Sequence, residues 1–513
     1  MSVSHRATRS NWCFRVHDVY AVQLVSARFL ALDLGAESGR AILGRLDGGV
    51  LTLKDVRRFP NVAVRTNGSL HWDILRLWHE VKTSLEDVTD VSLASVGLDT
   101  WGCDYALLGE QGQLLENPYH YRDTRSDDAP SQVFRQVSAE RIYATTGIQF
   151  LNFNSLFQLY SAKRSTPNLL RAATAFVTIP DLLNYWLTGR LASEYTIATT
   201  TQMIDAERRT WAKPLLAELG LPTQLFQPLV EPGTVIGGVR HDVSASLADT
   251  PVVAPACHDT GSAFAAVSTD AGGAFLSSGT WSLLGAEVNA PVISARARDL
   301  NFTNEGGVNG TTRLLKNIAG LWLLQACMRR WAESGQPVSY DDLLVAARDD
   351  GLAFRSVFDP DHSSFFNPAD MPAAIAAYCR QTDQAEPAGQ PGYARAILES
   401  LALKYRVVLE WLEEVSGRRY THIRIVGGGS RNRLLNQFTA DATGRTVLAG
   451  PVEATALGNI AMQLLATGTV RSLAEARAII EQSFPVERFD PVATDRWATH
   501  YSRFKEYREV MGV

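Results

Sequence analysis

The clearest chemistry in the sequence is offered by Asp259, which stands between His258 and Thr260, just after the apolar run Pro251–Cys257. An aspartate that follows a strand and precedes a helix commonly caps that helix, and its position alone favours this structural role. If a cleft brings His258 and Thr260 beside a sugar hydroxyl, the same carboxylate can accept the proton of that hydroxyl. Asp259 is therefore the candidate general base.

Two turns rich in small residues are candidates for binding phosphate. Gly35–Arg40 follows the apolar run Arg28–Leu34, and Ser277–Thr280 follows Phe275-Leu276. Backbone N–H groups approach a phosphate closely only where side chains are small, and Gly and Ser meet that condition. Each turn alone is typical of an ordinary hairpin. The pair, together with a third glycine turn at Gly427–Gly429, favours a nucleotide site.

Charged and aromatic residues accompany these turns. Arg40 would add positive charge near phosphate, and Asp33, at the end of a predicted strand, could hold Mg²⁺ or its waters. Glu37 has the wrong sign for a phosphate, so we expect it to point away or to reach a metal-bound water. Trp101 and Asp104 form a turn suited to binding a sugar, with a loop anchored by a buried tryptophan as the alternative.

The apolar pattern predicts the elements that must position these residues. Strand–turn–strand units at Arg28–Leu46 and Ala274–Glu287 suggest a duplicated architecture. The spacing of Trp497, Tyr501 and Phe504 indicates a core-facing stripe on a C-terminal helix. We also expect strands at Val91–Leu98, Pro251–Cys257 and Arg424–Val426, a hairpin near Asn309-Gly310, and helices at Pro180–Leu187, Ile318–Trp331 and Ala394–Val415. This alternation predicts an α/β fold with a parallel sheet in each half and a boundary near Ala265–Gly273.

Composition excludes several classes of protein. The 513 residues suggest two to four domains, and 49 Lys and Arg against 54 Asp and Glu, for a net charge of −5, argue against a nucleic-acid-binding protein. No run of eighteen apolar residues predicts a membrane span. The five cysteines are scattered and odd in number, which excludes a disulfide scaffold or thiolate zinc site and suits a reducing, cytoplasmic environment. Walker, H-E-x-x-H, G-x-S-x-G and G-x-G-x-x-G signatures are missing.

The first 27 residues precede the predicted fold. The apolar stretch Val19–Ala27 follows basic residues and superficially resembles a secretory signal. Asp18 and Gln23 interrupt what is already a short apolar run. We therefore expect residues 1–27 to be a disordered N-terminal extension, or the product of a start codon placed too early.

Two sets of longer motifs identify a resemblance that runs from about Phe29 to Tyr507. The first set is Asp33-Leu34-Gly35, Tyr121–Arg125, Pro180-Asp181-Leu182 with Leu187-Thr188-Gly189, Pro232–Gly237, Gly427–Gly429 and Glu453–Gly458. The second set is Asp99–Gly102, Gly147–Phe150, Ala198–Gln202, His258–Thr260, Asn304–Gly307, Lys316–Ile318 and Gly320–Gln325. In this order the motifs resemble the FGGY family of carbohydrate kinases, and the second set resembles the members that act on L-rhamnulose.

The resemblance implies a two-lobed actin/hexokinase/Hsp70-like ATPase fold with duplicated ribonuclease H-like domains and an interdomain cleft. Residues 28–268 would form the N-terminal domain, which binds sugar and phosphate. Residues 269–513 would form the C-terminal domain, which binds ATP and ends in a helix. The implied activity, in L-rhamnose degradation, is transfer of the γ-phosphoryl group of ATP to the 1-hydroxyl of L-rhamnulose, with Mg²⁺ as cofactor.

The resemblance also assigns roles to residues. Asp259 would accept the proton of the sugar hydroxyl, and Asp33 would hold the metal. Cys103 and Tyr105 are departures beside the sugar that bear on fine specificity. Sugar contacts would be Gly102, His258, Asp259, Thr260 and Asn317, and ATP contacts would be Ala36, Glu37, Ser38, Gly39, Arg40, Thr280, Gln325 and Gly428. The partners would be a small sugar and ATP, without nucleic acid or membrane, in a monomer or small homo-oligomer.

Three other functions stay open at this point. A kinase of the same family for L-fuculose or D-xylulose would differ in its sugar contacts around Trp101–Tyr105 and at Asn317. A sugar-independent ATPase of the same fold would not need the turn His258–Thr260. A sugar-responsive binding protein should lack the base or the phosphate turns, and this sequence has both.

Overall fold

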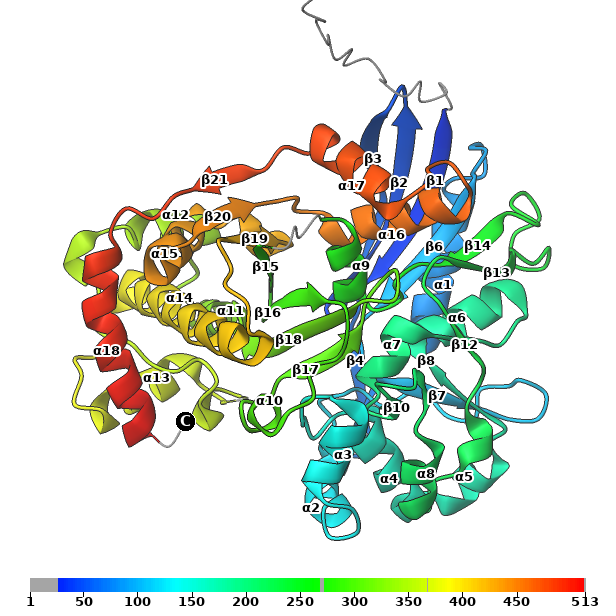
Figure 1. Cartoon of the computed structure of the whole chain (residues 1–513), viewed down its shortest axis with the longest axis horizontal. Coiled ribbons are helices and arrows are strands. Elements are labelled where there is room, and N and C mark those ends of the chain that lie inside the picture. Colours follow the sequence, from blue (N-terminus) through cyan, green and yellow to red (C-terminus); the bar gives the residue numbers. More distant parts are fainter. Residues whose placement is uncertain (1–25, 268–271, 367, 512–513) are drawn as a thin grey trace, which may run out of the picture.

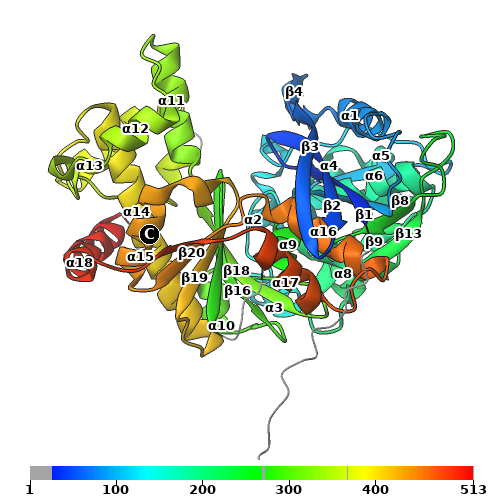
Figure 2. The ribbon, with the colours of Figure 1, turned by 90° about the horizontal axis from the view of Figure 1, so that it is seen from above.

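Two β-sheets organise the protein, one in each half of the chain. The computed structural model describes residues 26–267, 272–366 and 368–511. Figures 1 and 2 show the two halves beside each other, with helices packed around each sheet. Each sheet contains a parallel pairing as well as antiparallel ones, so the predicted α/β class is confirmed.

The order of the strands shows how the two sheets are built. The six strands of the first sheet run β13 (Thr234–Gly238), β14 (Pro251–Ala254), β6 (Ser95–Thr100), β1 (Ala27–Leu34), β2 (Ser38–Asp47) and β3 (Val50–Pro60). The seven strands of the second run β17 (Thr303–Gly306), β18 (Thr312–Ala319), β16 (Trp281–Val288), β15 (Gly273–Ser278), β19 (His422–Val426), β20 (Thr446–Ala449) and β21 (Glu487–Phe489).

Short strand pairs and helices complete the first half. The strands are β4 (Ala63–Thr66), β5 (Ser69–Trp72), β7 (Tyr105–Leu108), β8 (Ala175–Thr178), β9 (Ser193–Glu194), β10 (Ile204–Asp205), β11 (Thr210–Trp211) and β12 (Leu229–Val230). The helices are α1 (Ile74–Glu86), α2 (Ala129–Val133), α3 (Ala139–Thr146), α4 (Ser155–Ser165), α5 (Pro167–Ala172), α6 (Ile179–Thr188), α7 (Tyr195–Thr200), α8 (Lys213–Glu218) and α9 (Asp259–Ala265). Helix α6 ends as predicted, because Gly189 takes the left-handed conformation with φ 76°.

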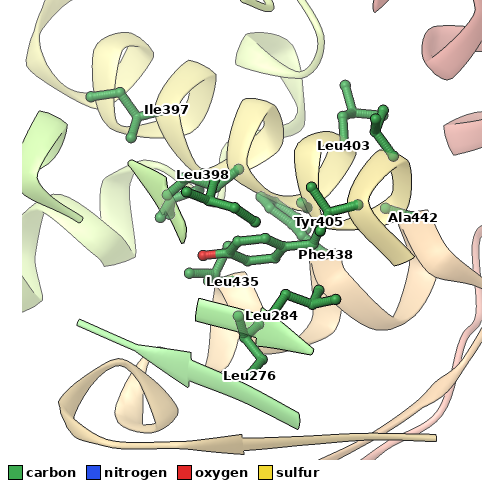
Figure 3. Packing of buried hydrophobic residues seen from close by; sticks show 14 of the residues in the cluster. Leu276, Leu284, Ile397, Leu398, Leu403, Tyr405, Leu435, Phe438 and Ala442 are labelled. Atoms are coloured by element: carbon green, nitrogen blue, oxygen red, sulfur yellow. The ribbon is translucent and has the colours of Figure 1, made fainter. Parts of the chain in front are cut away.

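The second half contributes the remaining helices, of which α16 and α17 pack on the first sheet. They are α10 (Ala295–Asp299), α11 (Trp322–Glu333), α12 (Tyr340–Ala346), α13 (Met371–Gln381), α14 (Gly389–Ser416), α15 (Arg433–Thr443), α16 (Ala454–Ala466), α17 (Leu473–Ser483) and α18 (Thr494–Val510). Figure 3 shows side chains of α14 and α15 packed against Leu276 and Leu284 of the sheet. The predicted stripe of Trp497, Tyr501 and Phe504 on α18 is buried, as expected.

The two hairpins predicted as a duplication take the same place in their sheets. Strand β1 pairs antiparallel with β2 and parallel with β6, while β15 pairs antiparallel with β16 and parallel with β19. The turns are closed similarly, since the Gly35 N–H donates to the Ser38 carbonyl at 3.0 Å and the Gly279 N–H donates to the Trp281 carbonyl at 2.9 Å. The repeated hairpins thus confirm the architecture suggested by the sequence.

Helix α16 crosses from the second half onto the first sheet, beside β1 and β6 (Figure 1). A Cβ added at Gly458 would lie 1.7 Å from the Ser262 carbonyl oxygen of α9, so these helices touch backbone to backbone. Gln463 Nε2 donates to the Leu30 carbonyl at 3.1 Å, and Asn459 Nδ2 donates to Asp99 Oδ2 at 2.6 Å. The halves therefore share a packed interface next to the strand ends.

Two predicted elements begin later than expected. The strand expected at Val91–Leu98 begins only at Ser95, where its pairing with Phe29 of β1 starts. The helix expected at Ile318–Trp331 begins at Trp322, because Ile318 pairs with Ser282 and stays in the sheet. In both cases the apolar pattern extends beyond the element, and pairing with a distant strand sets where the strand begins or ends.

Parts of the predicted organisation fall outside the described residues. The expected N-terminal extension lies outside them up to residue 25, and the expected domain boundary lies partly in the omitted segment 268–271. Within the described parts of the chain, no helix is both long and apolar enough to cross a membrane.

Candidate functional site

A cavity of about 400 Å³ lies between the two halves, where both hairpin turns end. The first half contributes Gly35, Ala36, Glu37, Ser38, Trp101, Gly102, Cys103, His258, Asp259 and Thr260 to its walls, and the second half contributes Ser277, Gly279, Thr280, Trp281, Thr303, Glu305 and Asn317. All five predicted sugar contacts are among these lining residues. The predicted ATP contacts divide, because Ala36, Glu37, Ser38 and Thr280 line the cavity, whereas Gly39, Arg40, Gln325 and Gly428 are not part of its lining.

Asp259 is the first residue of α9, and its side chain is 28% exposed in the cavity wall. The cap position itself belongs to His258. The Asp259 carboxylate accepts hydrogen bonds from the Thr260 N–H at 2.5 Å and the Thr260 hydroxyl at 3.1 Å. The aspartate is therefore not the helix cap that its position favoured, and its carboxylate is open to a ligand.

The imidazole of His258 lies between two carboxylates. Its Nε2 is 3.4 Å from Asp259 Oδ1, and its Nδ1 is 3.1 Å from Glu305 Oε2. Arg313 Nη2 lies 3.2 Å from that same Glu305 oxygen and 3.2 Å from His258 Nδ1. Burial by itself would raise the pKa of Glu305, but the nearby charges of Arg313 and His258 outweigh it and hold the pKa below its usual value.

Buried groups of the first half hold the backbone at Cys257 and His258. The Glu194 carboxylate accepts the N–H of Cys257 at 3.1 Å, and the Thr196 hydroxyl accepts the N–H of His258 at 3.3 Å. Burial raises the pKa of Glu194 to about 7 and that of its neighbour Asp181 to about 8. The turn His258–Thr260 is thus fixed by polar groups that water does not reach.

Gly102, Cys103 and Asn317 form the other walls of the cavity near the proposed sugar contacts. Gly102 faces Thr200, whose side-chain atoms would lie 3.1–3.2 Å from an added Cβ. Cys103 has a φ of 72°, and its N–H donates to the Thr200 hydroxyl at 3.1 Å. Across the cavity, Asn317 Nδ2 donates to Gln149 Oε1 at 3.0 Å. This last bond joins β18 of the second half to a loop of the first.

Asp104 is a structural residue in this arrangement. Its Oδ2 accepts the indole N–H of Trp72 at 2.6 Å and that of Trp101 at 3.0 Å, and its Oδ1 accepts from Gln158 Nε2 at 2.8 Å. Burial raises the pKa of Asp104 to about 6. Asp104 therefore anchors its loop to buried tryptophans, which was the alternative to binding sugar. Trp101 also lines the cavity.

Gly39 and Arg40, the last two residues of the first turn, support it without lining the cavity. An added Cβ at Gly39 would lie 2.2 Å from the ring of Phe59, so this glycine is needed for packing. Arg40 forms ion pairs with Asp33 and with Glu453, which belongs to the second half. The guanidinium therefore neutralises two carboxylates beneath the turn.

The second turn is surrounded by closely packed backbone. A Cβ at Gly320 would lie 2.6 Å from the Gly279 carbonyl oxygen, and one at Gly429 would lie 2.1 Å from Ser278 Oγ. The Thr280 hydroxyl donates to Gln325 Oε1 at 3.4 Å, which places Gln325 next to the turn. Gly428 faces open space, because no atom lies within 4 Å of a Cβ built there.

Three carboxylates gather where the first turn meets α9. Asp33 and Asp99 are neighbours on paired strands, and burial, with a smaller contribution from the charge of Asp259, raises both pKa values against the opposing charge of Arg40. Among the described residues, Asp99 Oδ1 has no hydrogen-bond donor. The described chain holds no group of three or more His, Cys, Asp or Glu side chains placed to bind a metal on its own. A cation here would therefore need further ligands from a substrate or from water.

Sequence reasoning missed Glu305, Arg313, Gln149 and Glu194 as parts of the site. Two of the four, Glu305 and Gln149, lie in motifs that carried the family resemblance, namely Asn304–Gly307 and Gly147–Phe150. The resemblance marked these motifs without assigning them a role. Nothing in the local pattern indicated that Glu305 and Arg313 meet His258, which precedes them by 47 and 55 positions.

Comparisons with known proteins agree with this geometry. The N-terminal domain of the FGGY family of carbohydrate kinases matches residues 28–266, and the C-terminal domain matches residues 274–467. A rhamnulokinase of Bacteroides thetaiotaomicron is 46% identical over 93% of this chain and 98% of its own length. A rhamnulokinase of Oceanobacillus iheyensis is 40% identical over 91% of this chain and 99% of its own length.

Solved structures show the same fold at low sequence identity. A gluconate kinase of Lactobacillus acidophilus has a TM-score of 0.78 at 17% identity, covering 95% of this chain and 98% of its own. A xylulose kinase of the same organism has a TM-score of 0.77 at 17% identity, covering 95% and 99%. The predicted two-lobed fold is confirmed, and by its sequence matches the chain belongs to the FGGY family of carbohydrate kinases.

Proposed function

We propose that this protein transfers the γ-phosphoryl group of ATP to the 1-hydroxyl of L-rhamnulose, giving L-rhamnulose 1-phosphate and ADP. The observation that carries the proposal is the carboxylate of Asp259, which opens into a cavity that both hairpin turns also line. Relatives that are 46% and 40% identical over nearly their whole length are rhamnulokinases, which supports this sugar over other ketoses.

The sugar would bind against the first half. Gly102 leaves room for close approach, His258 and Thr260 flank Asp259, and the Asn317 amide reaches the same cavity from β18. Asp259 would accept the hydroxyl proton as the sugar oxygen attacks phosphorus. Such general-base assistance is worth about 10²–10⁴-fold in rate.

ATP would bind between the two turns. Ala36–Ser38 and Thr280 would present backbone and hydroxyl groups to its phosphates, with Gln325 and Gly428 next to the second turn. Gly39 and Arg40 would not contact ATP and would instead support the first turn. Phosphoryl transfer depends mainly on positioning and on neutralising charge, and closure of the halves around both substrates would exclude water.

We also propose that Mg²⁺ accompanies ATP. Asp33, Asp99 and Asp259 present oxygen ligands only, and an unpartnered oxygen on Asp99 fits a nearby cation. Asp33 would hold the ion or its waters together with the phosphates. When bound, Mg²⁺ would offset the negative charge of the transferring group.

These roles assign a different ligand to each domain of the chain. We assign residues 28–268 to a domain that binds sugar and phosphate and residues 269–513 to a domain that binds ATP. We further propose that the enzyme works in the cytoplasm, because scattered free cysteines and the use of ATP suit that compartment. We also propose that it is a monomer or a small homo-oligomer.

The test is release of ADP from ATP and Mg²⁺ with L-rhamnulose, L-fuculose, D-xylulose, glycerol or no sugar. We expect turnover with L-rhamnulose well above the others. If turnover were highest with another ketose, the protein would be a kinase of the same family that acts on that ketose. Equal ADP release with and without sugar would point to an ATPase and withdraw the role given to Asp259.

The Asp259→Asn variant tests the base directly. We expect kcat to fall about 10²–10⁴-fold while the affinity for the sugar, measured by tryptophan fluorescence, stays similar. The control is Asp242→Asn, which removes a carboxylate from an exposed ion pair with Arg240 and should leave turnover unchanged. Near-normal turnover of Asp259→Asn would overturn the assignment.

A further inference from the structure

We propose that Glu305 and Arg313 are positioning residues that fix the imidazole of His258 against Asp259. The inference rests on the proposed function, because it concerns how the same site is held in its working geometry. It assigns a role to a motif, Asn304–Gly307, that the family resemblance marks without explaining.

The geometry is a short chain of charged groups that crosses from one half to the other. Glu305 lies on β17 and Arg313 opposite it on β18, in register. Glu305 Oε2 is 3.1 Å from His258 Nδ1 and 3.2 Å from Arg313 Nη2. On the far side of the ring, Nε2 is 3.4 Å from Asp259 Oδ1. Glu305 and Asp259 thus face opposite nitrogens of one imidazole.

Burial makes this contact rigid. Arg313 is 0% exposed and Glu305 is 5% exposed, so neither charge can turn to water. Arg313 is also held by its Nε, which donates to the Gly306 carbonyl at 2.8 Å. A buried charge is tolerated only when it is paired, and here each charge keeps the other in place. Glu305 therefore presents its carboxylate at one fixed point beside the ring.

A fixed partner at one ring nitrogen decides what the other nitrogen can do. A guanidinium only donates, so Arg313 Nη2, which Glu305 holds in place, donates to Nδ1 at 3.2 Å and leaves the ring proton on Nε2, toward Asp259. The Nε2–H can then donate to Asp259 or to a sugar oxygen. The Glu305 contact thus sets the ring orientation that the proposed sugar contact requires.

The supports of His258 come from different halves. Its backbone is held by Glu194 and Thr196 of the first half, whereas its ring is held by Glu305 and Arg313 of the second. Neighbouring residues bring β17 close enough for this. A Cβ at Gly306 would lie 2.6 Å from the ring of Tyr195, and Asn304 Nδ2 donates to the Gly147 carbonyl at 3.0 Å. The ring is therefore aligned only when the halves keep this arrangement.

The test is a double-mutant cycle with Glu305→Gln and His258→Gln, measured as kcat and KM for L-rhamnulose and for ATP. Glutamine keeps the shape but removes the charge that holds Arg313 against Nδ1. We expect Glu305→Gln to lower kcat about 10- to 100-fold, the usual effect of removing a partner that orients a functional group, with KM for ATP unchanged. In the His258→Gln background the same change should have little further effect, because it acts through the ring.

The matched control is Glu399→Gln, which neutralises another buried glutamate paired with an arginine. Glu399 lies on α14, where Oε1 accepts from Arg395 Nε at 2.5 Å and Oε2 accepts the Phe354 N–H at 2.8 Å. We expect this variant to lower thermal stability and leave kcat unchanged. If Glu305→Gln does not fold, Glu305→Asp keeps the charge at a shorter reach and should give an intermediate loss of kcat.

Two outcomes would overturn the proposal: an unchanged kcat in folded Glu305→Gln, or an equal loss of kcat in both backgrounds of the cycle. A readout independent of turnover separates this proposal from the proposed function. In protein labelled with ¹⁵N-histidine, the resonances missing from His258→Gln identify the ring, and Glu305→Gln should shift them toward a different tautomer. If the wild-type protein does not phosphorylate L-rhamnulose, this shift still decides the positioning role, and its absence would overturn it.

Discussion

The turn after β1 and the turn after β15 occupy equivalent places in two similar hairpins, and they meet the same cavity with different chemistry. The first is flanked by Asp33 and Arg40, and Arg40 also pairs with Glu453. The second, Ser277–Thr280, contains no charged residue and is enclosed by backbone at Gly320 and by Gly427–Gly429. Residues that tie together distant parts of the chain support the first turn, and close packing supports the second.

This difference shows two ways to prepare a site for a charged ligand. On the first side, opposite charges are paired before any ligand arrives, so the turn depends on electrostatic balance. On the second side, glycines allow neighbouring backbone segments to approach closely, so the turn is held by packing and not by charge. Variants at the two turns should therefore fail in different ways.

The largest effect is expected for Gly320→Ala. The new Cβ would lie 2.6 Å from the Gly279 carbonyl oxygen and 2.7 Å from the Thr280 carbonyl oxygen, and backbone atoms cannot move aside as a flexible side chain would. We expect a loss of about 3 kcal/mol in the free energy of unfolding, measured by urea denaturation. Gly428→Ala is the control, because nothing lies within 4 Å of its Cβ; it should keep wild-type stability and raise only KM for ATP. Equal stability of both variants would contradict the packing account.

A smaller effect is expected for Arg40→Ala. This change leaves Asp33 and Glu453 without their shared cation in a partly buried site. We expect the protein to lose about 2 kcal/mol of stability and part of its turnover. Arg45→Ala, which removes an exposed pair with Asp47, should change stability by less than about 0.5 kcal/mol. If the two arginine variants behaved alike, the charge balance under the first turn would be unimportant.

The smallest effect, counted per pH unit, is a dependence of stability on pH that arises in the first half. The pKa of Asp181 is about 8 in the folded protein against 3.8 for the free side chain, because burial disfavours its charged form. The folded state then binds more protons than the unfolded state between these values, so stability is greatest at low pH and falls as pH rises toward 8. We expect Asp181→Asn to reduce the slope of the free energy of unfolding with pH by up to the value for one bound proton, about 1.4 kcal/mol per pH unit.

The measurement for this slope is urea denaturation at several pH values between 5 and 7.5. Asp242→Asn, at an exposed aspartate, is the control and should keep the wild-type slope. A slope that Asp181→Asn leaves intact would mean that the buried carboxylates behind His258 do not titrate in this range. The nucleotide-side turn has no titratable residue, so its variants should leave the slope unchanged.

Much of the fold could be predicted because its signals are local. The hairpin around Gly35–Arg40, the stop of α6 at Gly189 and the buried stripe on α18 each follow from residues close together in sequence. The late starts of β6 at Ser95 and of α11 at Trp322 follow from pairing with strands elsewhere in the chain. Local pattern indicates that an element exists, while its partner strand sets where it begins.

The candidate site divides in the same way. Asp259 and the two turns could be named from residue type and spacing, and the resemblance added Gly102 and the roles of Asn317 and of the ATP contacts. Glu305, Arg313 and Glu194 could not be placed, because an ion pair between distant positions leaves no periodic trace in the sequence. Nor could the local pattern show that Gly39 packs on Phe59 while Gly428 faces open space.

The sequence by itself determined the kind of protein: a duplicated α/β chain with an aspartate at a strand end, small residues at two turns and the motifs of a carbohydrate kinase family. These depend on local propensity and on side-chain chemistry, which the order of residues states directly. Only the tertiary structure decided that Arg40 is shared by Asp33 and Glu453, that Asp104 holds two indoles, and that the ring of His258 is held from the opposite half. Those contacts join residues far apart in sequence, and they exist only after folding has removed the groups from water and each charge has had to find its partner.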